Sequence, residues 1–392
     1  MARCGDGLAV GTDLESVAVE AADAAVAALD GRPPDLACVF AAGGDPDEVA
    51  AALQLAAERT GARTSVGCTA SGVIGAGQAV QHRSGVSVWT AALPGARLRA
   101  FHLEVLRSPE SMAVLGLPQQ HCDDQVALLL ADPWSFPSEG FVLQTNDALP
   151  GLSVVGGLAS GAASGSTRLL VDGRVVHRGA VGVVIGHAPG VRTVVSQGCR
   201  PVGPLMTVTA ADGNVLLGLA GSPALALVKQ IISTLPPDEQ ALATLGLQVG
   251  VSMDEYADER GQGDFLVRGI LGFDVARDGI VVADVLPVGC TVQLQVRDAD
   301  AAATDLAGAL AGFRDRGELD PVDGALLFSC DGRGEGLFGD AGHDVRAVRS
   351  GLRTSAVAGF FAAGEIGPVG GRNHLHALSV TLLVVGAAEP AP

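Results

Sequence analysis

The sequence predicts an α/β protein in which mixed sheets are flanked by helices and built on repeated strand-helix-strand-hairpin units. Three observations support this prediction: an internal repeat, a strongly capped helix between two apolar runs, and a composition suited to compact domains. Of the 392 residues, 48% are hydrophobic and 17% are charged. This balance is typical of a folded protein, and the length suffices for two or three domains with their own cores.

The internal repeat is the strongest of the three observations. Residues 66–72 begin with valine and glycine and end with alanine, serine and glycine, and residues 155–161 repeat that pattern. A weaker third copy covers residues 358–364. An apolar run precedes each copy, and a histidine followed by a β-type run comes after it. The repeat therefore predicts similar units, one over residues 35–105 and another over residues 125–197.

Two helices are expected in the first part of the chain. Residues 12–29 are predicted to form a helix, with Thr12 and Glu15 as its capping box. The connection of the first unit is marked more clearly, because Asp45 suits the N-cap, Pro46 the first helical position and Glu48 the capping box. Apolar side chains recur there at helical spacing until a glycine ends the pattern.

Further along the chain, a segment without an obvious copy separates the second and third units. Residues 222–235 favour a helix that opens with a proline, and residues 264–274 and 279–284 favour two strands joined by a turn. In the third unit, residues 343–352 are expected to form the helix that connects its strands.

The charge and cysteine content exclude several classes of protein. A formal charge of −18, from 25 basic and 43 acidic residues, argues against binding to nucleic acid or to an anionic membrane. No apolar stretch reaches the roughly 18 residues that span a bilayer, and the amino terminus lacks the apolar core of a signal peptide. The seven cysteines show no paired spacing. We therefore expect free thiols, no structural metal and a reducing cytoplasm.

The most informative motif lies near the carboxyl terminus. The apolar run 325–329 breaks into Cys330 and a glycine-rich turn that carries Arg333, and a second run from Gly359 ends at Glu365. This pairing sets one thiol, one guanidinium and one carboxylate on glycine-rich backbone at the ends of two strands. A small polar ligand could bind there.

Each of these side chains has a functional and a structural interpretation. Cys330 is a nucleophile if nearby cationic groups lower its pKa, or a small buried side chain at a turn. Arg333 could bind a ligand carboxylate, because its planar guanidinium group binds a carboxylate bidentately. Alternatively, it could form an internal salt bridge to a residue such as Glu365. Glu365 meets Arg333 or a cationic ligand group, because a buried carboxylate must be paired.

Two other patterns carry little weight. The glycines from Gly334 to Gly339 match a dinucleotide-binding pattern, but no acidic residue follows at the required distance. His374 and His376 would share one face of a strand without a third metal ligand in register. Neither a cofactor nor a metal ion is therefore predicted.

Ser71 and Ser160, at equivalent repeat positions, are interpreted mainly as small residues that let strand ends pass closely.

The repeated glycine motifs and the Gly-Glu-Ile-Gly-Pro strand end resemble those of FIST sensory proteins, from about Asp35 onward. The resemblance implies an amino-terminal helix over residues 1–34, a FIST N domain over 35–221 and a FIST C domain over 222–392. FIST proteins often carry a Gly-Glu-Ile turn in the first domain too, whereas this chain has Val73 at that position. A ligand site in the first domain would thus lack its carboxylate.

The resemblance also implies a sensory role in signal transduction, with a small molecule such as an amino acid as ligand. Without a fused output domain, the protein would act alone or through a separate signalling partner. We expect a cleft between the two domains in which Arg333 receives a ligand carboxylate and Glu365 an ammonium. Its expected lining is Cys330, Arg333, Gly359, Phe361, Glu365 and Asn373, with Cys68 and Thr69 from the first domain.

Two alternatives to a sensory protein stay open at this point. One is a thiol-dependent hydrolase that uses Cys330, which predicts selective alkylation of that thiol at neutral pH. The other is an interaction scaffold without a ligand, which predicts no pocket between the two glycine-rich strand ends. Of these alternatives, the sequence favours a protein without catalytic residues over an enzyme.

Overall fold

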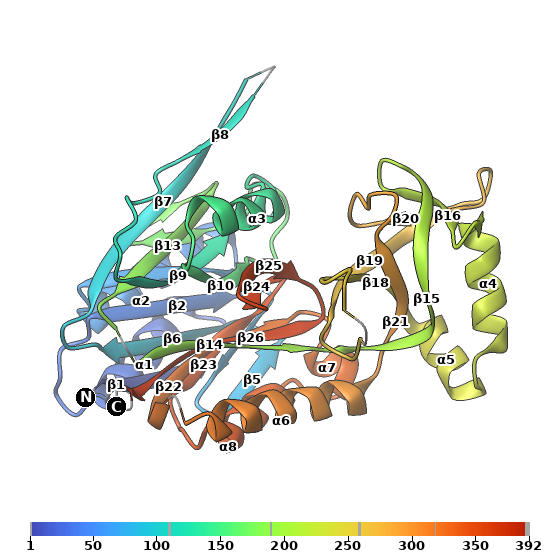
Figure 1. Cartoon of the computed structure of the whole chain (residues 1–392). Helices are drawn as coiled ribbons and strands as arrows, with labels where there is room; N and C mark the ends of the chain where they lie inside the picture. Colours follow the sequence, from blue (N-terminus) through green and yellow to red (C-terminus); the bar gives the residue numbers. More distant parts are fainter. Residues whose placement is uncertain (1, 109–110, 189, 258–259, 318, 389–392) are drawn as a thin grey trace. The chain divides into compact units, whose positions relative to one another are not determined.

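The computed structural model describes residues 2–108, 111–188, 190–257, 260–317 and 319–388 (Figure 1). The chain divides into two compact units, each made of separate segments. Unit 1 comprises Met1–Val195, Ala307–Leu375 and Val380–Pro392, and unit 2 comprises Ser196–Leu306 and His376–Ser379. The segments after residue 306 therefore return, except for His376–Ser379, to the unit that the amino-terminal half begins.

Three mixed sheets build unit 1. In the first, the order is β1 (Arg3–Val10), β6 (Gly85–Ala92), β2 (Leu36–Ala42), β3 (Thr64–Ala70), β11 (Leu169–Val171) and β12 (Arg174–Val176). The second runs β25 (Arg372–His376), β24 (Glu365–Val369), β10 (Ser153–Leu158), β9 (Asp124–Ala131), β13 (Ala180–Gly186), β7 (Arg97–Arg107) and β8 (Met112–Leu115). The third runs β14 (Val191–Gln197), β26 (Ser379–Ala388), β22 (Leu319–Cys330), β23 (Val357–Ala362), β4 (Gly72–Gly75) and β5 (Gln78–Gln81).

Each sheet contains a parallel strand pair and borrows a hairpin from elsewhere in the chain. The parallel pairs are β2–β3, β9–β10 and β22–β23. The hairpin that follows each pair joins a different sheet: β4–β5 pairs with β23, β11–β12 pairs with β3, and β24–β25 pairs with β10. The three sheets are thus linked in a ring by an exchange of hairpins, which the sequence patterns do not reveal.

One glycine occupies the same structural position in each parallel pair. A β-carbon at Gly67, Gly156 or Gly359 would lie 2.2, 2.0 or 1.8 Å from the carbonyl oxygen of the neighbouring strand. On its other side, each glycine is paired with an apolar residue of a borrowed hairpin: Leu170, Ile366 and Ile74, respectively. The two strands approach closely only because no side chain stands between them. We expect the whole units 35–105 and 125–197 to superpose as well.

The inner faces of the three sheets share one hydrophobic core. At its centre, the Phe40 ring lies 4.8 Å from the Phe360 ring and 6.4 Å from the Phe328 ring, measured between centroids. These three rings come from β2, β22 and β23, that is, from two different sheets. Burial of apolar surface at this junction stabilises the ring of sheets as one body.

Helices cover the outer face of the first sheet. The cap of α2 (Pro46–Thr60) is confirmed: the Asp45 side chain and Glu48 form the capping box, and Gly61 ends the helix in the left-handed conformation. The cap predicted for α1 (Leu14–Ala27) is wrong by one residue, because Asp13 rather than Thr12 accepts a hydrogen bond, from the Ser16 amide. Both helices bury alanine-rich faces against the sheet.

The remaining helices of unit 1 lie on the other two sheets. Val142 of α3 (Ser138–Ala148) packs into a separate core beside β9 and β10. After β22 come the short α7 (Gly334–Phe338) and then α8 (His343–Leu352), which confirms the helix expected over residues 343–352. Beside them, α6 (Ala299–Asp315) carries the chain from unit 2 into unit 1.

Unit 2 is an antiparallel sheet covered by helices, and the first part of α6 also belongs to it. Its strand order is β15 (Cys199–Asp212), β21 (Thr291–Arg297), β18 (Leu247–Ser252), β19 (Phe265–Asp274), β20 (Gly279–Val282), β16 (Val215–Leu219) and β17 (Ser222–Pro223). A further pairing of β15 with β16 closes six of these strands into a ring. The expected helix begins at Ala224, and α4 (Ala224–Thr234) and α5 (Pro237–Gly246) cover the core.

No helix in the described part of the chain is long and apolar enough to cross a membrane.

All seven cysteines carry free thiols, as the spacing predicts, and only Cys122 is exposed. Burial raises the pKa of the thiols of Cys4, Cys38 and Cys68. We therefore expect a thiol titration of the native protein to show one fast-reacting group, which Cys122→Ser removes. The unfolded, unreduced protein should titrate seven thiols, and a smaller number would contradict the assignment.

Candidate functional site

All eight residues predicted to line the site belong to unit 1. Cys330 is the last residue of β22, Gly359 and Phe361 lie in the adjacent strand β23, and Glu365 begins β24. The turn after β22 carries Arg333. The sequence therefore places the thiol, the guanidinium and the carboxylate correctly at strand ends, but within one compact unit.

Arg333 is held by a carboxylate that the sequence reasoning missed. Its Nε and Nη2 donate hydrogen bonds of 2.8 and 2.9 Å to the two carboxylate oxygens of Asp344 in α8. The Ser329 hydroxyl donates a further bond of 2.8 Å, and Nδ1 of His343 lies 3.1 Å from the same carboxylate. The guanidinium fork therefore forms an internal salt bridge, one of its two expected interpretations, but its partner is Asp344 and not Glu365.

The ion pair is completely buried and shifts the titration of both partners. Burial acts to raise the pKa of Asp344, but Arg333 and three hydrogen bonds hold it well below its ordinary value. Burial likewise acts to lower the pKa of Arg333, but Asp344, Cys330 and Glu365 together raise it. Both groups therefore stay charged at neutral pH, and Glu365 lies near enough to act on the guanidinium electrostatically.

One donor of Arg333 is left over. The Arg333 side chain is 0% exposed, so Nη1 cannot bond to solvent. Nη1 also has no hydrogen-bond acceptor among the described residues. The Phe338 ring of α7 lies beside the guanidinium, with 5.3 Å between Cζ and the ring centroid. An unsatisfied buried donor costs about 1–3 kcal/mol, so native proteins rarely keep one without a reason.

A second polar cluster lies on the same strand ends and was missed as a site. Oδ1 of Asp331 accepts a hydrogen bond from the Ser71 hydroxyl, and the Ser71 amide donates one of 2.8 Å to Oγ of Ser160. The Ser160 hydroxyl donates to the carbonyl oxygen of Phe361. Burial raises the pKa of Asp331 to about 6, against the opposing effect of the Ser71 bond. The equivalent serines of the repeat were the available signal for this cluster.

The polar atoms of the other predicted residues make internal hydrogen bonds. The Thr69 hydroxyl oxygen accepts a bond of 2.9 Å from the Arg168 amide, and Cys68 is part of the shared core. The Asn373 side chain accepts a bond from the Val154 amide and donates to the Leu152 carbonyl, at 2.9 and 3.0 Å. These contacts fix β3, β10 and β25 in place. Cys330 is only 9% exposed, which makes its thiol a poor target for a bulky substrate.

Together these groups form what we call the strand-end site: Ser71, Ser160, Asp331, Arg333, Asp344 and Glu365. The set combines three carboxylates and two hydroxyls with a guanidinium that retains a donor. Asp331 is half-buried, so the cluster reaches the surface there. Such a set can hydrogen-bond a small molecule that carries both a cationic and an anionic group.

The fold and the comparisons with known proteins define the class of protein. The FIST N domain model matches residues 35–222, and the FIST C domain model matches residues 224–368. The chain belongs to the FIST family, whose domains are sensory domains of signal transduction. The boundary between the two models falls inside unit 2, so the sequence domains and the compact units divide the chain differently.

Mycobacterial proteins are similar to this chain over nearly its whole length. An uncharacterized protein of Mycobacterium tuberculosis is 41% identical over 382 residues, which cover 97% of this chain and 98% of that protein. An uncharacterized protein of Mycobacterium bovis is 39% identical over 385 residues, with the same coverage of 97% and 98%. Their descriptions assign no ligand or activity, so the ligand must be argued from the site itself.

Proposed function

We propose that the chain is a sensory protein that binds a small zwitterion, with an amino acid as the candidate, at the strand-end site. The observation that carries the proposal is the unsatisfied Nη1 of Arg333. A ligand carboxylate would accept its hydrogen bond, and the ligand ammonium would face the buried carboxylate of Glu365. Asp331 and Ser71 would form the half-buried entrance.

Binding at this place requires the turn above Arg333 to move. The helix α7 spans five residues, begins at Gly334 and is followed by Gly339, and these glycines have φ angles of +27° and +68°. Its Phe338 ring rests beside the guanidinium. We propose that α7 moves outward when the ligand enters and that this displacement is the sensory response, because a switch needs an element with two arrangements.

A separate signalling partner would read the displaced segment. The charge of −18 makes a protein a more suitable partner than nucleic acid or an anionic membrane. We place the protein in the cytoplasm because its seven thiols are unpaired.

A thermal-shift screen of the amino acids and related small acids tests the proposal. At about 100 times its dissociation constant, a ligand that binds only the folded state stabilises it by about 2.7 kcal/mol. That stabilisation should raise the melting temperature by a few degrees. The expected result is at least one hit, with a shift that is reduced in Arg333→Lys, which keeps the charge but removes Nη1, and in Glu365→Gln.

Arg346→Lys is the matched control, because Arg346 belongs to the same helix as Asp344 but forms an exposed pair with Asp340. A hit should shift this variant as much as the parent protein. If the hit also shifts Arg333→Lys and Glu365→Gln by the full amount, the ligand binds elsewhere. A screen without any hit would count against an amino acid ligand and favour a scaffold.

A further inference from the structure

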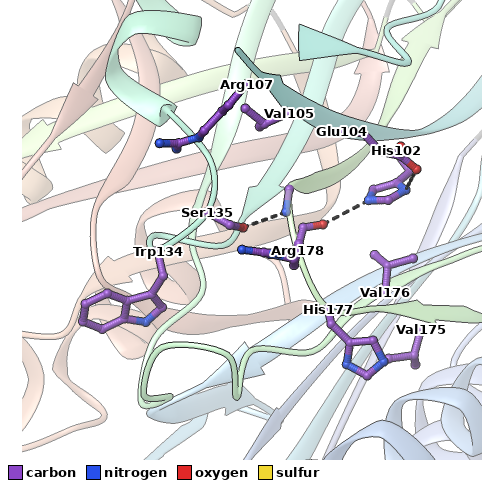
Figure 2. A pocket seen from close by; sticks show the side chains of 11 residues that line it. His102, Glu104, Val105, Arg107, Trp134, Ser135, Val175, Val176, His177 and Arg178 are labelled. Atoms are coloured by element: carbon purple, nitrogen blue, oxygen red, sulfur yellow. Dashed lines mark hydrogen bonds and ion pairs between the residues drawn. The ribbon is translucent and has the colours of Figure 1, made fainter. Parts of the chain in front are cut away.

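A cavity of about 730 Å³ opens in unit 1 and is lined by none of the residues of the strand-end site. Its walls come from the end of β7, the loop after β9, and β12 with the turn that follows it (Figure 2). This volume lies within the range of pockets that hold small organic ligands. Its charged and aromatic lining consists of His102, Glu104, Arg107, Trp134, His177 and Arg178.

Hydrogen bonds hold the walls of this cavity in position. Oγ of Ser135 accepts a bond of 2.9 Å from the Gly179 amide (Figure 2). The Ser135 hydroxyl donates to the buried carboxylate of Asp132 at 2.5 Å. The Asp132 amide in turn donates a bond of 2.9 Å to the Gly179 carbonyl. Gly179 has a φ of +86°, and a β-carbon there would lie 2.0 Å from the Leu103 carbonyl oxygen. The backbone that presents Arg178 is therefore fixed.

Positive charge is concentrated at this cavity in a chain with a net charge of −18. Two arginines line it, against one glutamate. Arg107 and Arg178 are exposed and form no ion pair with any described residue. Nε2 of His102 lies 3.0 Å from the carbonyl oxygen of Arg178, which can only accept, so this nitrogen carries a hydrogen. Unpaired guanidinium groups in a concave site attract anions.

The same cavity presents an aromatic face. Trp134 is 57% exposed, although its indole N–H donates a hydrogen bond of 3.1 Å to the Ala162 carbonyl, which fixes the ring. Val175 and Val176 add apolar lining. A large exposed indole with a fixed orientation offers a surface on which a planar ring can stack. The combination of this ring with two unpaired guanidinium groups narrows the class of ligand.

We infer that this cavity binds a planar aromatic ring that carries two negative charges, stacked on Trp134 and held by Arg107 and Arg178. The ring supplies apolar contact with the indole and the two valines, and the anionic groups pair with the guanidinium groups. The inference is independent of the strand-end site, because the two sites share no residue.

Tryptophan fluorescence gives a direct readout of this site. The chain has two tryptophans, of which Trp89 is completely buried and Trp134 lines the cavity. Adenosine monophosphate and phthalate serve as probes, with adenosine and benzamide as uncharged rings and inorganic phosphate and succinate as anions without a ring. We expect at least one probe to quench the fluorescence saturably. Half-maximal quenching should need an about tenfold lower concentration of that probe than of its uncharged ring or its ringless anion.

Substitutions in the cavity should change the affinity selectively. Arg107→Gln and Arg178→Gln should each weaken binding of the probe about tenfold, because each removes a charged hydrogen-bond donor. Arg174→Gln is the control, because Arg174 is an exposed residue of β12 outside the cavity lining. Arg333→Lys should leave binding of the probe unchanged, which separates this site from the strand-end site.

Three results would overturn the inference. The first is the absence of saturable quenching by both probes, confirmed by calorimetry. The second is equal binding of the uncharged rings or of the ringless anions. The third is a loss of affinity in Arg174→Gln as large as in Arg107→Gln, which would indicate a general charge effect instead of a site.

Discussion

Replacing Gly359 by alanine should destabilise unit 1 by about 3 kcal/mol or more, with smaller losses of the same kind for Gly156→Ala and Gly67→Ala. The alanine β-carbon at residue 359 would lie 1.8 Å from the Leu327 carbonyl oxygen, so the parallel strands must move apart. Both neighbours of β23 in the sheet would then shift. Urea unfolding followed by tryptophan fluorescence measures the loss, because both tryptophans belong to unit 1.

Gly140→Ala is the matched control for this series. Gly140 lies in α3, has ordinary helical backbone, and has nothing within 4 Å of the position that a β-carbon would take. Alanine is a better helix former than glycine by about 1 kcal/mol, so this variant should be as stable as the parent or more stable. If the strand glycines tolerate alanine as well as Gly140 does, the close approach of the parallel strands is wrong.

The second large effect is expected at the buried ion pair. Asp344→Ala should destabilise unit 1 by about 3–5 kcal/mol, because it leaves the guanidinium of Arg333 buried without its carboxylate. The double variant Arg333→Met with Asp344→Leu should recover much of that loss, because it removes both charges from the interior. A double-mutant cycle by urea unfolding measures the coupling between the two residues.

The same ion pair predicts a dependence of stability on pH. The pKa of Asp344 is lower in the folded than in the unfolded state, so its contribution is fully present above the ordinary aspartate pKa of about 4. That contribution is lost as the pH falls from there toward the lower folded pKa. Asp344→Asn should lack this loss, whereas Asp340→Asn, in an exposed pair with Arg346, should retain it. An unchanged acid profile in Asp344→Asn would contradict the assignment.

The sequence predicts best the elements whose signals are local. The capping box and the glycine stop of α2 lie within the helix they define, and they are confirmed. In contrast, β1 was missed because Gly5 and Gly7 interrupt its apolar pattern. In the structure, a β-carbon at Gly5 would lie 2.1 Å, and one at Gly7 2.0 Å, from a carbonyl oxygen of α1. These glycines are required by the packing of a helix on the strand, which no local pattern reveals.

At the strand-end site, too, the sequence does not reveal contacts between segments that lie far apart in the chain. The glycine-rich turn and the isolated charge predict that Arg333 and Glu365 lie at neighbouring strand ends. In the structure Arg333 lies in the turn after β22, and Glu365 begins β24, a strand of another sheet. The partner of Arg333 could not be predicted, because Asp344 reaches it through the packing of α8 on β22 and β23. The cavity around Trp134 depends on three segments that only the folded chain brings together.

The exchange of hairpins has a consequence for biosynthesis. The hairpin β4–β5 is made early, but its partner β23 lies near the other end of the chain, and β10 likewise waits for β24. Until translation reaches these late strands, β4 and β10 each lack one neighbour and present unpaired backbone groups. Such edges are templates for aggregation, and pairings between distant segments form slowly. A nascent chain of this protein thus remains incomplete, and in need of protection, until nearly its last strand has left the ribosome.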